Sequence, residues 1–204
     1  MYSQPQDDQM GEVNDDRERT LSVNDYALSL MLSLHTGARW GHCYENAYPA
    51  FFAFPQLFEP HGRFVEGWVV IEDQDNLVLM EHGWLGSGEQ IIDPTIVLGV
   101  EPGQPVYYFP GVLRARAELE ALENEFFPHV RFSDYGDDGM SHPDYRAAYE
   151  AARQKASSLL TEGKTLVEVK AKVQTAEEEE ATKLKTPGCR IILLSVDQGG
   201  NVYG

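Results

Sequence analysis

Residues 81–95 read EHGWLGSGEQIIDPT and place a turn-forming string between two runs of strand-forming residues. Its glycines and serine predict a hairpin whose centre lies between Ser87 and Gly88. Centred there, the hairpin puts His82 directly opposite Asp93 on one face, with Cβ atoms about 5 Å apart. A carboxylate in that position fixes the tautomer of an imidazole and stabilises its charged form. The alternative is a surface histidine beside an aspartate that ends a strand.

Segments on either side extend this hairpin into a sheet. Residues 64–71, FVEGWVVI, and 77–85, LVLMEHGWL, are rich in β-formers and flank the turn-like string DQDN. The segment EQIIDPTIVLG, from 89 to 99, reads as the next strand. We therefore expect an antiparallel meander in which Trp84 shares the face of His82 and walls a site there.

Upstream of the sheet, residues 41–54 read GHCYENAYPAFFAF and put Cys43 in front of a strongly apolar run. The run predicts a helix packed on the sheet, which Pro49 should kink or end early. Free cysteines are usually buried and inert. At a helix N-terminus, however, unpaired N–H groups and the helix dipole favour the thiolate, which is the nucleophilic form. Cys43 is therefore either a small core residue or a nucleophile.

The chain begins with a polar, acidic segment, residues 1–19, which we expect to be a disordered tail. Residues 21–35 predict a helix, and Gly37 is a natural stop for it. The apolar side chains of this helix are spaced as in an amphipathic helix. They are Leu21, Leu28, Met31, Leu32 and Leu34.

The second half of the chain changes character. Residues 112–127 predict a helix that Pro128 ends. A further helix is expected with Pro143 in its first turn and Gly163 past its end.

Strand-like patterns follow, at residues 166–173 and 190–196. The expected organisation is thus a tail, a core over residues 20–111, and a partly helical extension over 112–204 that packs on the core as one domain. The fold class is α+β.

Composition narrows the function. A formal charge of −17 argues against nucleic-acid binding, which rests on a basic surface. The acidic residues crowd the middle of the chain, where they either keep the protein soluble or favour a cationic or amine-bearing peptide or protein as partner.

Two cysteines far apart in the chain predict no disulfide framework, and we expect no metal and no cofactor. No apolar stretch approaches the ~20 residues that span a bilayer, and the first residues do not resemble a secretory signal. We therefore expect a cytoplasmic protein that does not associate with membranes.

Four blocks in this order resemble the transglutaminase-like superfamily, a group of papain-like folds that includes transglutaminases, peptide N-glycanases and bacterial cysteine proteases. The resemblance covers about residues 37–110. The blocks are Gly41-x-Cys43-x-Glu45-x-Ala47, Phe64-Val65-Glu66-Gly67-Trp68, His82-Gly83-Trp84 and Ile92-Asp93-Pro94-Thr95. In that family a nucleophile-bearing helix packs on an antiparallel sheet. The family's nucleophile helix is usually uninterrupted, unlike the one expected here, and nothing after residue 111 matches a member.

The resemblance implies a catalytic triad. Cys43 would be the nucleophile, His82 the general base and acid, and Asp93 the residue that orients the imidazole. The implied reaction is acyl transfer from an amide through a thioester, in a protease, a deamidase or a transglutaminase. The Cys43 N–H would stabilise the oxyanion together with a side-chain donor, either Trp40 or Asn46.

Two other functions stay open. One is acyl transfer from a thioester donor, as in arylamine N-acetyltransferases, which use a similar triad. The other is a non-catalytic binding or inhibitor protein on the same scaffold, because a fold alone does not establish an activity.

Overall fold

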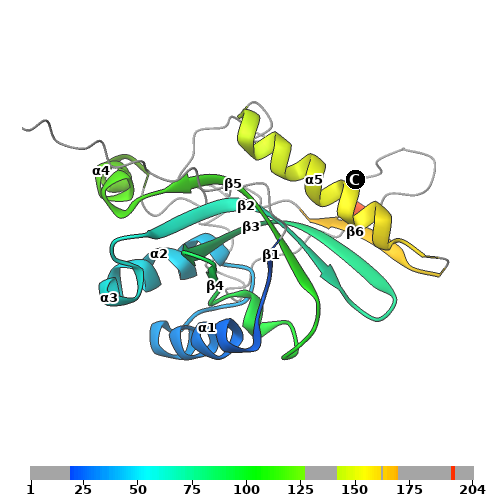
Figure 1. Cartoon of the computed structure of the whole chain (residues 1–204), viewed down its shortest axis with the longest axis horizontal. Helices are drawn as coiled ribbons and strands as arrows, with labels where there is room; N and C mark the ends of the chain where they lie inside the picture. Colours follow the sequence, from blue (N-terminus) through cyan, green and yellow to red (C-terminus); the bar gives the residue numbers. More distant parts are fainter. Residues whose placement is uncertain (1–18, 127–141, 162, 170–193, 196–204) are drawn as a thin grey trace, which may run out of the picture.

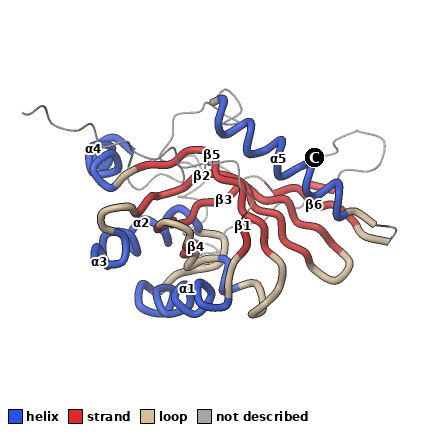
Figure 2. Tube along the Cα trace, in the orientation of Figure 1, coloured by secondary structure: helices blue, strands red, loops and turns tan. Residues whose placement is uncertain are grey.

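The computed structural model describes residues 19–126, 142–161, 163–169 and 194–195. The expected tail over residues 1–18 lies outside these ranges, but Arg19 already belongs to a strand. The fold is mixed α+β, with one curved sheet between helices (Figure 2). The strands are β1 (Arg19–Thr20), β2 (Gly62–Glu72), β3 (Asn76–Ser87), β4 (Gln90–Ile92), β5 (Val106–Arg114), β6 (Thr165–Val169) and β7 (Leu194–Ser195).

The sheet is mixed rather than antiparallel throughout. Its order is β1-β5-β2-β3-β6-β7, and β4 pairs with the far end of β3. Strand β6 runs parallel to β3, whereas the other pairs are antiparallel. The β2–β3 hairpin predicted around DQDN is confirmed and forms the centre of the sheet.

Helices cover both faces of this sheet (Figure 1). They are α1 (Val23–Thr36), α2 (Cys43–Ala53), α3 (Pro55–Phe58), α4 (Arg116–Phe126) and α5 (Pro143–Leu159), with a short 3-10 helix η1 (Ile96–Leu98). Helix α5 lies across one face, and α1 and η1 lie under the other.

The α5 face is built from large sheet residues and small helix residues. Trp68 and Leu79 of the sheet are buried against α5. The helix meets them with alanines at four-residue spacing, Ala148, Ala152 and Ala156, all of which are buried. Small side chains in a row let the helix lie close to the sheet. The expected C-terminal extension therefore shares a core with the strands before it.

Helix α2 packs on a stretch of β3 that, in the described pairings, has β2 on one side and no strand on the other. Strand β6 pairs with β3 up to Met80, and β4 pairs from Leu85 onward. Between these points lies Gly83, where an added Cβ would come within 2.6 Å of the Tyr44 ring. The missing side chain at this position lets the start of α2 approach β3. This approach brings Cys43 to the strand that carries His82.

Pro49 does not end the α2 helix, so one of the two effects expected of it is wrong. The helix continues to Ala53 because Pro49 lies on its exposed side, where the carbonyl of Glu45 that loses its donor can reach water. The buried residues on either side, Ala47 and Phe51, keep the helix anchored in the core.

Helix α1 forms as predicted, but only part of its predicted apolar face points inward. Ser22 caps it by accepting a hydrogen bond from the Asp25 N–H at 3.1 Å, and Gly37 ends it with φ of 66°. Of its predicted apolar face, Leu32 is buried and Leu28 packs partly buried against the core, but Met31 and Leu34 are exposed.

Two further expectations were wrong in their bounds. The third strand ends early, at Ile92, because Pro94 cannot donate to a ladder, and η1 follows instead of a strand. The helix expected from residue 112 begins at Arg116, since β5 continues through Arg114. The division expected at 111 therefore falls inside a strand.

Helix α5 is confirmed with Pro143 in its first turn, and it ends at Leu159. Of the strand predicted at 166–173, the structure describes the part within β6, which ends at Val169. Of the strand predicted at 190–196, it describes β7, Leu194–Ser195. Pro128 and Cys189 lie outside the described residues.

Candidate active site

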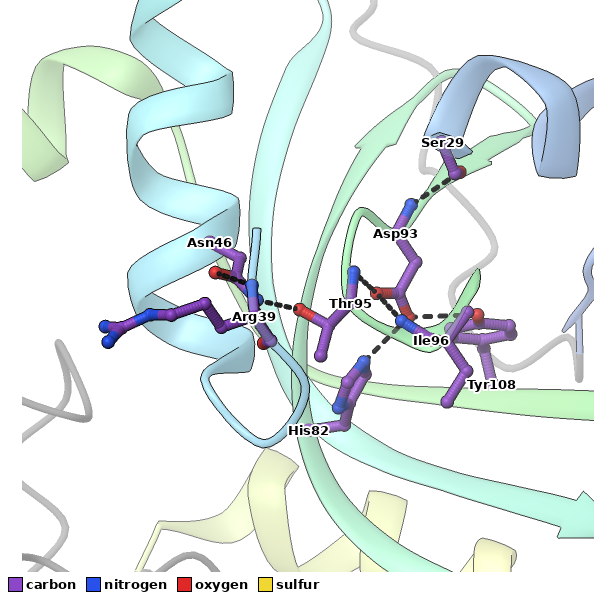
Figure 3. Close-up of polar contacts among 8 residues, drawn as sticks. All are labelled: Ser29, Arg39, Asn46, His82, Asp93, Thr95, Ile96 and Tyr108. Carbon is purple, nitrogen blue, oxygen red and sulfur yellow. Dashed lines mark hydrogen bonds and ion pairs between the residues drawn. The ribbon is translucent and has the colours of Figure 1, made fainter. Parts of the chain in front are cut away.

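His82 and Asp93 form a buried pair. The Nε2 atom of His82 lies 2.7 Å from Oδ2 of Asp93 (Figure 3). Their side chains are 1% and 0% exposed. The expectation that these two residues meet is therefore confirmed, and the alternative of a surface histidine is wrong.

The register that brings them together differs from the predicted one. The turn is Gly88–Glu89, and Ser87 pairs with Gln90. Asp93 follows the last paired residue, so it lies diagonal to His82 rather than opposite it. Moving the turn by one residue changes the partner of each residue by two positions. Such a change leaves every side chain on its original face, which is why the prediction still found the pair.

Asp93 accepts hydrogen bonds at both oxygens (Figure 3). The Thr95 and Ile96 N–H groups donate to Oδ1 at 3.0 and 2.9 Å. The Tyr108 hydroxyl donates to Oδ2 at 3.0 Å, beside His82. Four donors therefore stabilise a fully buried carboxylate, whose position is fixed from several directions.

The main chain at Asp93 is held as well. Its N–H donates to the Ser29 hydroxyl at 2.8 Å, so α1 positions this residue from the opposite side. Burial, and then the charge of Asp93, hold the pKa of Tyr108 well above its usual range. Tyr108 is therefore a protonated donor to Asp93 at any physiological pH.

Cys43 is the first residue of α2, as predicted, and is 9% exposed. The helix has no side-chain cap at His42, and its first intrahelical bond runs from the Asn46 N–H to the His42 carbonyl at 2.8 Å. The preceding N–H groups, including that of Cys43, therefore have no partner within the helix. They and the helix dipole present positive charge at the thiol.

Cys43 lies close enough to His82 to act on its charge. Burial alone would lower the pKa of His82, but the charges of Asp93 and Cys43, and side-chain hydrogen bonding to both, raise it to about 10. The Nδ1 atom makes no hydrogen bond of regular geometry, so the thiol is near the imidazole without being aligned with it. His82 is therefore protonated at neutral pH.

Trp84 walls this site, as expected. Its ring stacks on that of His82 with centroids 6.3 Å apart and an interplanar angle of 17°. Its other neighbour is Tyr108, which meets it edge-on at 5.1 Å. Trp84 is buried and keeps water from this side of the His82–Asp93 pair.

Asn46, one of the two expected oxyanion donors, is occupied elsewhere. Its Nδ2 donates to the Arg39 carbonyl at 2.6 Å and to the Thr95 hydroxyl at 2.8 Å (Figure 3). Its Oδ1 accepts from the Arg39 N–H at 3.0 Å. Both amide hydrogens are thus used to hold the loop before Cys43, and Asn46 has none left for an oxyanion.

Trp40, the other expected donor, is 39% exposed. Its ring lies so close to Gly99 that an added Cβ there would be 2.2 Å from it. The adjacent Leu98 is 40% exposed. These two residues make an apolar rim near the loop that leads to Cys43.

Two acidic residues expected to contribute to a surface charge are inside the protein. Glu66 and Glu81 are 0% and 3% exposed. Glu81 accepts a hydrogen bond from the Tyr44 hydroxyl at 3.4 Å, and Glu66 lies 4.0 Å from Arg114. They contribute less to the field at the surface than the sequence indicates.

Sequence reasoning missed Ser29, Tyr108 and the two N–H donors to Asp93. The backbone donors were foreseeable, since aspartate before a proline-containing turn commonly accepts from the next N–H groups. Ser29 gave no such signal, because a serine within a helix rarely points inward to a distant strand.

Among the described residues, no group of three or more His, Cys, Asp or Glu side chains is arranged to hold a metal. No helix in the same ranges has both the length and the apolarity to cross a membrane. Comparisons with protein-family models, curated proteins and solved structures find no match for this chain.

Proposed function

We propose that this chain is a cysteine-dependent hydrolase or acyltransferase that acts on amide bonds through a thioester on Cys43. The observation that carries the proposal is the buried 2.7 Å contact of His82 with Asp93, next to a cysteine at an uncapped helix start. A positively charged imidazole stabilises a neighbouring thiolate, and the thiolate is the attacking form. A papain-like arrangement of the transglutaminase-like type is part of this proposal.

In the first half of the reaction, the Cys43 thiolate attacks the amide carbonyl, and a carbon–sulfur bond forms. The oxyanion lies against the Cys43 N–H at the start of α2. As the carbon–nitrogen bond breaks, the His82 imidazolium gives its proton to the departing amine. Asp93 keeps the imidazole oriented throughout.

In the second half, His82 takes a proton from the incoming nucleophile as it attacks the thioester. The carbon–sulfur bond then breaks, which restores the Cys43 thiolate beside the His82 imidazolium. Water gives a protease or deamidase, and an amine gives a transglutaminase. We favour water, because it is always present and no second pocket for an amine is evident between residues 37 and 110 of the sequence. Cys43 is the most exposed of the three residues, so the substrate approaches from the start of α2.

The deciding experiment incubates the protein with a mixed proteome and a labelled primary amine, and compares wild type with Cys43→Ala by mass spectrometry. New peptide termini indicate proteolysis, a gain of about one dalton at Gln or Asn indicates deamidation, and amine incorporation indicates transamidation. We expect new termini or deamidation in the wild type alone. Identical digests, together with arylamine-dependent consumption of acetyl-CoA, would support the acetyltransferase function instead.

A substrate-free control tests the nucleophile itself. Iodoacetamide at mildly acidic pH should alkylate Cys43 much faster than Cys189, and His82→Ala should remove most of the difference. His61→Ala is the matched control, because His61 is exposed and precedes β2. Slow, equal labelling of both cysteines in the wild type would favour the non-catalytic binding protein.

A further inference from the structure

The inner side of helix α1 carries polar residues beside the apolar Leu28 and Leu32. Three of its buried residues are polar, namely Asp25, Ser29 and Ser33. Ser29 is buried because it accepts the hydrogen bond from the Asp93 N–H. Positioning the candidate site thus occupies the inner face of α1 with polar groups.

The opposite side of α1 carries an apolar stripe, here called the outer stripe. Its members are Val23, Ala27, Leu30, Met31 and Leu34. Val23 and Leu34 are 70% and 75% exposed and Met31 is 49% exposed, whereas Leu30, at the edge of the stripe, is half-buried and packs partly against the core. A run of this kind on a helix surface marks an interaction site.

The main contacts of α1 with other described elements are with α2, β4 and η1, on its inner side. Figure 1 shows α1 at the outer limit of the molecule, on the side of the sheet away from α5. Within the described ranges, the outer stripe therefore faces solvent along most of this 14-residue helix.

We propose that the outer stripe joins two copies of this chain through antiparallel α1 helices. The spacing of the stripe supports a second copy, because Val23, Ala27, Leu30 and Leu34 follow one another at intervals of four, three and four residues. That pattern reads the same from both ends, as a two-fold axis requires. The axis sets Val23 against Leu34 of the second copy and the small Ala27 against the larger Leu30.

The lack of charge on the outer stripe excludes one class of partner. The stripe has no charged member, although the chain carries a formal charge of −17. A strongly charged partner would find nothing on it to pair with, whereas an identical apolar stripe complements it. Because both copies are acidic, salt should strengthen the pairing by screening their repulsion. The contact is a single helix pair, so the dimer should form with rising concentration rather than permanently.

Sedimentation of the full chain over a range of protein and salt concentrations tests this pairing. The wild type should shift from 22.9 kDa toward twice that mass as either concentration rises. Ala27→Glu and Leu34→Glu should remain monomeric, while Leu160→Glu, an exposed apolar site just past α5, should dimerise like the wild type. Unchanged helix content by circular dichroism confirms that the variants fold.

Cross-linking tests the antiparallel register in a Cys43→Ser, Cys189→Ser background. A mixture of Val23→Cys and Leu34→Cys chains should oxidise to a disulfide dimer, and either variant alone should not. A wild type that stays at the monomer mass, a dimer that survives both glutamate substitutions, or cross-linking of each single variant with itself would each overturn the proposal.

Discussion

Asn46 donates a hydrogen bond of 2.8 Å to the Thr95 hydroxyl, and this bond joins the helix that begins with Cys43 to the segment that carries Asp93. Nucleophile and orienting carboxylate come from parts of the chain about 50 residues apart. Their relative position therefore depends on bonds of this kind, in addition to the packing of α2 on β3.

A double-mutant cycle on Asn46 and Thr95 should reveal this link. Asn46→Ala and Thr95→Val should each lower the free energy of unfolding by roughly 1–3 kcal/mol, because each leaves buried polar partners unsatisfied. The double variant should lose less than the sum of the two. Urea unfolding measures the coupling, and iodoacetamide labelling should slow in all three variants. Strict additivity would mean that the bond does not couple the two segments.

Tyr108→Phe should weaken the site through Asp93. The change removes one of four donors to a buried carboxylate, so we expect a loss of about 1–3 kcal/mol in the free energy of unfolding and slower labelling of Cys43. Tyr26→Phe is the matched control, since within the described part of the chain the Tyr26 hydroxyl donates to main-chain oxygens alone, those of Val97 and Val100. It should lower stability without changing the labelling rate. Equal effects of both variants on labelling would exclude a positioning role for Tyr108.

His82 should make stability depend on pH in a defined window. Its pKa rises from the ordinary 6.5 to about 10 on folding, so its contribution is complete below about 6.5 and disappears as the pH passes 10. We expect the difference in unfolding free energy between wild type and His82→Gln to shrink by a few kcal/mol across that window. Chemical unfolding at several pH values measures it. A difference that stays constant or grows with pH would contradict a protonated His82.

The apolar rim of Trp40 and Leu98 should select for apolar groups on reagents that reach Cys43. We expect N-phenyl iodoacetamide to label Cys43 roughly fivefold or more faster than iodoacetamide, an effect within the range of one apolar contact. Trp40→Ala should remove the preference and leave the iodoacetamide rate unchanged. Leu160→Ala, at an exposed leucine outside the site, should change neither rate.

Trp40→Phe separates the two roles considered for this residue. A phenyl ring keeps the apolar surface but lacks the indole N–H, so the preference for the phenyl reagent should persist. If the indole also serves as oxyanion donor, substrate turnover should fall in the same variant. Loss of the preference in Trp40→Phe would show that the rim is not simply apolar.

The sequence was most informative where local chemistry and periodicity agree. Alternation within 77–85 and 89–99 placed His82 and Asp93 on one face, although the turn is shifted by one position along the chain. Local signals also placed ends of two helices correctly, since Gly37 ends α1 and Pro143 lies in the first turn of α5.

The rest depends on contacts between distant segments. The pairing of β6 beside β3 in parallel is set by where α5 delivers the chain, which no local pattern encodes. The inner side of α1 includes Ser29, whose bond to Asp93 the hydrophobic pattern of the helix does not indicate. Tyr108 reads as an ordinary core aromatic until its hydroxyl is seen to reach Asp93.

The bond from Asp93 to Ser29 also limits how far the chain can be cut. The family-like blocks span about residues 37–110, but the serine that holds Asp93 lies before them, and β5 continues beyond them. A fragment trimmed to the blocks would keep the three candidate catalytic side chains and lose one of their supports. The smallest piece of this protein that keeps Cys43 rapidly alkylated should therefore start no later than Ser22, the cap of α1, and two separately produced halves should regain that reactivity only when α1 is present.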